Sequence, residues 1–158
     1  MNRLIAVRLL VLPMLFATAA VAAQAPATPA PQALTYEMAV QVIDAAEAEA
    51  RKNKWNVTIV VTDAAGVPVV LRRLSGASPR SYDIASRKAA TVVATKLTTA
   101  DYGAQLKAGS VKEVPNGITF AGGVPIVRGS EFIGAVGTSG VRAIEDEQIS
   151  KAGASVIK

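Results

Sequence analysis

The chain of 158 residues contains no cysteine and no histidine. These absences exclude a disulfide framework, serine or cysteine catalysis that relies on a histidine base, and a histidine-bound zinc or iron centre. Aromatic residues make up only 4% of the sequence, too few for the stacking platforms that bind single-stranded nucleic acid. We therefore expect no nucleic-acid partner, and we look for function among hydroxyl, carboxylate, phenol and basic side chains.

Residues 1–23 have the pattern of a secretory signal peptide. Two arginines precede an apolar run over residues 9–19, and small residues form a cleavage site after it. The run is shorter than the roughly 20 residues that a membrane span needs, so we expect cleavage and no stable membrane anchor afterwards. Cleavage after Ala23 leaves 135 residues and lowers the net charge from +5 to +3, because two arginines are lost. This predicts a periplasmic or secreted protein.

Residues 24–33 alternate alanine with proline, which predicts an extended linker. Residues 34–158 have the size of one domain. Apolar spacing in this domain predicts helix, two strands, two helices, three strands and a last helix. The expected elements cover residues 35–53, 57–62, 67–72, 79–96, 98–106, 118–120, 123–128, 132–138 and 141–157. We therefore predict an α+β fold in which helices flank a five-stranded antiparallel sheet.

Two details of these elements can be tested. Pro68 has no amide hydrogen to donate, so the strand over 67–72 is predicted to lie at a sheet edge. In the helix over 79–96, the apolar residues predicted to face inward are Tyr82, Ala85, Ala89, Val92 and Val93.

Glycines at positions 134, 137 and 140 interrupt the last predicted strand. Side chains alternate along a strand, so Gly134 and Gly140 share one face and Gly137 lies on the other. We predict that both faces are approached closely, one by the alanine-rich first helix and the other by a second subunit or a ligand. The alternative is that the glycines only permit a local twist or bulge.

The G-x-x-G-x-x-G spacing of this strand differs from the dinucleotide fingerprint G-x-G-x-x-G, and the acids at 145–147 would repel a phosphate at the next helix. Lys88 could act as a nucleophile only if burial lowered its pKa, and we expect a solvated or carboxylate-paired lysine. Asp63 and Asp146 are expected to serve as turn and cap residues.

Basic residues gather in the middle of the chain, where six lysines and arginines lie within 25 positions that contain one acid, Asp83. The simplest interpretation is a solvated helix face beside a strand end. The alternative is an anion site for the carboxylates of a ligand, since the planar guanidinium of arginine suits that role.

Five motifs follow one another over most of residues 34–158: VVTDAAGVPVVLRRLSGA, SYDIASRKAATVV, GGVPI, FIGAVGTSG and EDEQISKAG. In these motifs the chain resembles the GlcG/HbpS family, which is similar to the C-terminal domain of PduO-type corrinoid adenosyltransferases. The resemblance implies a profilin-like five-stranded sheet, a homo-oligomer, and haem binding in several members. Two departures stand out: Ser75 replaces an acid that the family usually has, and no histidine is available to ligate haem iron.

From the signal peptide and this resemblance we predict an exported, non-catalytic protein that binds a small ligand, with haem or a related tetrapyrrole as the leading candidate. Arg73, Arg80 and Lys88 are predicted to hold the propionates. The segment from residue 98 to 102 is predicted to approach the metal, with Thr98, Thr99 and Tyr102 as its cofactor-binding residues and Tyr102 as the iron ligand. The competing hypothesis is an oligomeric structural or interaction protein without a physiological ligand. No set of residues specifies an enzyme.

Overall fold

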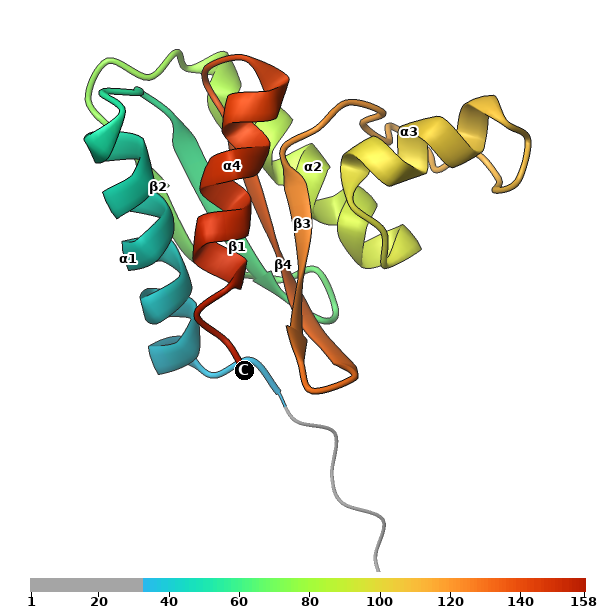
Figure 1. Cartoon of the computed structure of the whole chain (residues 1–158), viewed down its shortest axis with the longest axis horizontal. Helices are drawn as coiled ribbons and strands as arrows, with labels where there is room; N and C mark the ends of the chain where they lie inside the picture. The colour runs from blue at the N-terminus through green and yellow to red at the C-terminus, as the bar shows by residue number, and fades with distance from the viewer. Residues whose placement is uncertain (1–32) are drawn as a thin grey trace, which may run out of the picture. The chain divides into compact units, whose positions relative to one another are not determined.

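The computed structural model describes residues 33–158, which form one antiparallel sheet between helices on both faces (Figure 1). The predicted signal peptide and nearly all of the predicted linker lie outside the described residues. No helix in this described part is long and apolar enough to cross a membrane.

The sheet contains four strands in the order β2-β1-β4-β3, and each neighbouring pair is antiparallel. Helices α1 and α4 cover one face, α2 covers the other, and α3 lies beside α2 (Figure 1). The elements are α1 (Tyr36–Lys52), β1 (Thr58–Asp63), β2 (Pro68–Arg73), α2 (Arg80–Thr95), α3 (Thr99–Lys107), β3 (Gly123–Arg128), β4 (Glu131–Ser139) and α4 (Ala143–Ala154). The predicted α+β class with flanking helices is confirmed.

The prediction of a fifth strand over residues 118–120 is wrong, because the described residues contain four strands. The backbone amide of Ile118 donates to the Thr91 hydroxyl of α2 at 2.9 Å and not to a neighbouring strand. A short apolar run has the same pattern whether it pairs in a sheet or packs along a helix, and here it packs along α2.

Strand β2 lies at an edge of the sheet, as its proline predicts. Pro68 faces Thr62 of β1, and the register of the two strands shifts between Val61 and Thr62. The shift falls where Pro68 has no amide to donate to the ladder, so the irregularity and the edge position have one cause.

The inward face of α2 includes Ala85, Ala89 and Val92, as predicted, but not Tyr82, whose surface is 52% exposed. The sheet beneath explains this difference. A Cβ atom added to Gly137 of β4 would lie 2.2 Å from the Ala85 carbonyl oxygen, so backbone packs against backbone there. A helix this close to the sheet turns its small residues inward, and the bulky ring of Tyr82 lies at the surface.

The glycine strand accepts no side chain on either face, which confirms the predicted close packing. On the other face, a Cβ atom at Gly134 would lie 2.3 Å from the Thr62 carbonyl oxygen and 3.1 Å from Leu34. Two details of the prediction are wrong: both faces are covered by helices of the same chain, with α2 on Gly137 where a second subunit or a ligand was expected on one face, and Gly140 lies beyond the end of β4.

We expect Gly134→Val and Gly137→Val to lower the urea midpoint of unfolding, because overpacking a tight contact costs roughly 1–3 kcal/mol. Gly129→Asn is the matched control: Gly129 has a φ of +62° and open surroundings, and asparagine tolerates this backbone conformation. Light scattering on the same samples measures assembly size. Wild-type midpoints for both valine variants would contradict the close packing.

Candidate functional site

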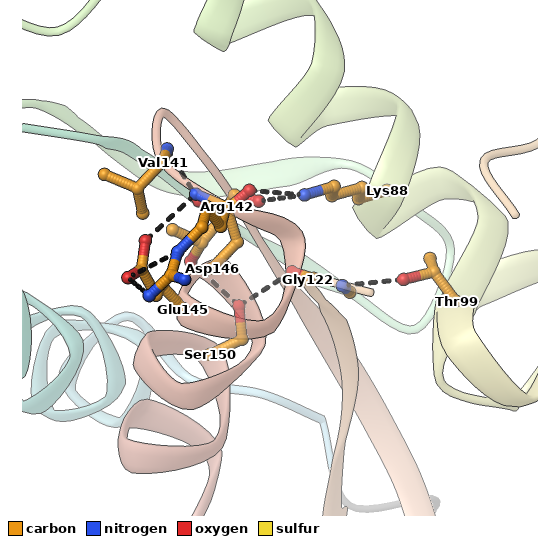
Figure 2. Close-up of polar contacts among 10 residues, drawn as sticks. Lys88, Thr99, Gly122, Val141, Arg142, Glu145, Asp146 and Ser150 are labelled. Carbon is orange, nitrogen blue, oxygen red and sulfur yellow. Dashed lines mark hydrogen bonds and ion pairs between the residues drawn. The ribbon is translucent and has the colours of Figure 1, made fainter. Parts of the chain in front are cut away.

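Lys88 of α2 is fully buried and forms an ion pair with Asp146 of α4 (Figure 2). Its Nζ atom donates to Asp146 Oδ2 at 2.8 Å and to the Thr138 carbonyl oxygen of β4 at 2.8 Å. The other carboxylate oxygen of Asp146 accepts from the Val141 amide at 3.2 Å. Helices α2 and α4 lie on opposite faces of the sheet, so this pair joins the two helical layers beside the end of β4.

A glycine makes room for the pair. A Cβ atom on Gly122 would lie 2.3 Å from Lys88 Nζ, and the φ of Gly122 is +126°, a conformation that L side chains rarely adopt. The Gly122 carbonyl oxygen accepts from the Thr138 amide at 2.8 Å. The Ser150 hydroxyl of α4 lies 2.8 Å from that same oxygen and 2.8 Å from Thr138 Oγ1. The polar groups around the ion pair are thus linked to one another.

Burial and attraction act in opposite directions on the two charges. Burial lowers the pKa of Lys88, while the nearby carboxylate of Asp146 opposes that shift. Burial raises the pKa of Asp146, and the Lys88 ammonium opposes that shift. The prediction of a carboxylate-paired lysine is confirmed. The expectation that Asp146 only caps a helix missed its second role, because its partner lies 58 positions away in the sequence.

The three predicted propionate contacts have different surroundings. Lys88 is engaged by Asp146. The guanidinium of Arg73 donates to the Ala77 carbonyl oxygen from Nε at 3.1 Å and from Nη2 at 2.8 Å. Arg80, the first residue of α2, is exposed and forms no ion pair with any described residue. Among these three cations, Arg80 is therefore the one ready to meet a ligand.

The other predicted contacts lie at α3. The Thr98 hydroxyl caps α3 by accepting from the Asp101 amide at 3.0 Å. Thr99 is fully buried, and its hydroxyl accepts from the Gly123 amide at 3.0 Å (Figure 2). Tyr102 is also fully buried, and its phenol oxygen accepts from the Val114 amide at 2.8 Å. The structure brings Lys88 and Thr99 together at Gly122 and Gly123.

An open hollow of about 380 Å³ lies between the start of α2 and the end of β4. Its lining residues are Ser78, Arg80, Ser81, Ile84, Ser139, Gly140 and Val141. None of these is acidic. Ser139 is only 6% exposed, and its hydroxyl has no hydrogen-bond partner among the described residues. A cation and a hydroxyl without a partner among the described residues make this hollow suitable for an anion.

The hollow adjoins the ion pair, because Val141 donates to Asp146 and Ser139 follows Thr138 in β4. Phe120 is a second neighbour of Lys88, with its ring centroid 5.1 Å from Nζ. Phe120 remains 46% exposed, so it offers an apolar surface beside the buried charge. Sequence reasoning missed Ser139 and Phe120, since neither belongs to a recognisable spacing. Over residues 33–158, no three histidine, cysteine or acidic residues cluster as a metal site.

Comparison with known proteins gives consistent relatives. A family described as "Haem degrading protein HbpS-like" matches residues 34–155. Protein GlcG of Escherichia coli K12 is 36% identical over 108 residues, which cover 67% of this chain and 81% of that protein.

Two solved structures are also similar. A double mutant of Streptomyces reticuli HbpS aligns with a TM-score of 0.75 and 34% identity, covering 90% of this chain and 99% of that one. A PduOC:heme complex aligns with a TM-score of 0.73 and 27% identity, covering 80% of this chain and 96% of that one.

We expect Lys88→Met and Asp146→Leu each to lower the free energy of unfolding by roughly 3–5 kcal/mol, because each leaves one buried charge without its partner. The double variant is expected to be more stable than either single variant, since it buries no charge. Urea unfolding of all four proteins measures this coupling.

Arg87→Met is the matched control, because the Arg87 guanidinium is partly exposed and lies 3.8 Å from the Asp83 carboxylate. Such a surface pair contributes at most about 1 kcal/mol. Strictly additive losses in the double variant would contradict the coupling between Lys88 and Asp146.

Proposed function

The chain belongs to the haem-degrading HbpS-like family, and we propose that it is an exported protein that binds haem or a related tetrapyrrole. The non-catalytic role that we also propose departs from that family description and is tested below by the fate of the Soret band. Export is supported by the predicted signal peptide over residues 1–23. Haem as the ligand is supported by the family description and by the similarity to a PduOC:heme complex. The observation on this chain that carries the proposal is the anion-favouring hollow at Arg80, which adjoins the Lys88–Asp146 ion pair, with the exposed Phe120 next to Lys88.

The residues present fit the two chemical parts of haem, an apolar macrocycle and two propionates. Phe120 would contact the macrocycle, and the Arg80 guanidinium would hold a propionate by charge-assisted hydrogen bonds. Arg73 remains the predicted second propionate contact, for which its guanidinium would leave the Ala77 carbonyl. Lys88 would act indirectly and not as a propionate contact, since its ammonium lies against the Phe120 ring and is paired with Asp146. Bound haem would supply a redox-active iron.

Hemin titration of the purified protein, followed by the Soret band, tests the proposal. We expect saturable binding at micromolar hemin and roughly tenfold weaker binding by Arg80→Ala, as for the loss of one charge-assisted hydrogen bond. Arg128→Ala is the control, because it removes an exposed cation at the end of β3 that does not line the Arg80 hollow.

Two outcomes would overturn parts of this proposal. Absence of a saturable Soret shift would overturn haem binding. If the same protein forms oligomers by light scattering, the alternative of a structural or interaction protein is favoured. A Soret band that forms and then fades faster than that of free hemin would overturn the non-catalytic role.

Ligation of the iron by Tyr102 is the second part of the proposal, since tyrosine is a known haem ligand and no histidine competes. The phenol would first have to leave the Val114 amide, which requires movement of the segment after α3. We expect Tyr102→Phe to remove the phenolate-to-iron charge-transfer absorption and to weaken hemin binding.

Thr98→Ala and Thr99→Ala show whether either hydroxyl also contributes to the spectrum. A wild-type spectrum for Tyr102→Phe would contradict ligation by this residue and leave the Arg80 test unaffected.

A further inference from the structure

A second hollow, of about 310 Å³, lies where α1 and β2 end, and it shares no lining residue with the hollow at Arg80. Its lining residues are Arg51, Lys54, Trp55, Asn56, Leu74 and Ser75. We call it the Trp55 hollow. The site proposed for haem does not use any of these residues, so the Trp55 hollow raises a separate question of function.

The lining of the Trp55 hollow contains donors and apolar surface but no acid. Arg51 and Lys54 are cationic, and the indole N–H of Trp55 has no hydrogen-bond partner among the described residues. Arg51 is already paired with Glu47 at 2.5 Å, whereas Lys54 forms no ion pair with a described residue. Trp55 and Leu74 pack against the hydrophobic core and form the apolar part of the lining.

Backbone contacts hold this arrangement in place. Lys54 has a φ of +58°, a conformation that is uncommon for a residue with a side chain. The Trp55 amide donates to the Ala50 carbonyl at 2.9 Å, which holds the backbone of Trp55 at the end of α1. On the other side, a Cβ atom on Gly76 would lie 2.7 Å from Asn56 Nδ2, so the loop after β2 packs tightly on Asn56.

We propose that the Trp55 hollow binds a small organic carboxylate with an apolar ring or chain. The carboxylate would meet Lys54 and the neighbouring donors, and the apolar part would lie on Trp55 and Leu74. The apolar part of the lining favours this ligand class over inorganic anions, for which the indole of Trp55 and the Leu74 side chain offer no partner. The absence of a lining carboxylate distinguishes it from amines.

Trp55 is the single tryptophan of the chain, so its fluorescence reports on this hollow alone. We expect sodium benzoate, used as the probe, to change this fluorescence saturably, and benzamide, its neutral analogue, to bind at least fivefold more weakly. Lys54→Asn is expected to weaken benzoate binding at least fivefold, because it removes the charge while asparagine tolerates the left-handed backbone.

Lys52→Gln is the matched control, because Lys52 lies two residues away, pairs with Glu49 at 4.0 Å and does not line the hollow. It is expected to bind benzoate as the wild type does. Lys54→Gly provides a second variant without the charge if the asparagine variant is destabilised in urea unfolding.

Equal binding of benzamide and benzoate, or equal affinities of the Lys54 and Lys52 variants, would overturn the proposal. Linear, non-saturable quenching that is the same in all variants would also overturn it. Hemin binding that survives these substitutions shows that the two sites are independent, whichever way the benzoate result falls.

Discussion

The buried ion pair between Lys88 and Asp146 is the interaction on which the arrangement of this molecule depends. It joins α2 to α4 past the end of β4, and both of its charged side chains are almost completely shielded from water. A buried pair of this kind stabilises the fold little in itself, but removing one partner is costly because the other charge stays buried. The pair therefore specifies how the two helical layers meet, and the Arg80 hollow lies beside that junction.

Close packing at Gly137 determines which side of α2 can carry this lysine. The Ala85 backbone contacts the strand directly. The rotation of the helix that turns Ala85 and Ala89 inward also buries Lys88, which lies one turn after Ala85. Tyr82 is turned outward for the same reason. A glycine in a strand has thus positioned a charge in a helix, and Gly122 provides the space that the charge occupies.

The two hollows lie on either side of one backbone contact. Gly140 lines the Arg80 hollow and Asn56 lines the Trp55 hollow, and a Cβ atom on Gly140 would lie 2.5 Å from the Asn56 carbonyl oxygen. Both linings are basic and lack acids, so this end of the sheet favours anions. Because the two hollows share no lining residue, a single substitution in one hollow can test the ligand proposed there separately from the ligand proposed for the other.

Local patterns in the sequence determined the helices, the edge position of β2, the close packing of the glycine strand and the family resemblance. Each of these follows from residues near one another in the chain, whose spacing reports directly on helix or strand geometry. Only the tertiary structure decided that residues 118–120 pack along α2, that Tyr82 faces outward and that Asp146 is the partner of Lys88. Those features depend on which surfaces meet, and contacts such as the one across 58 positions leave no periodic trace in the sequence.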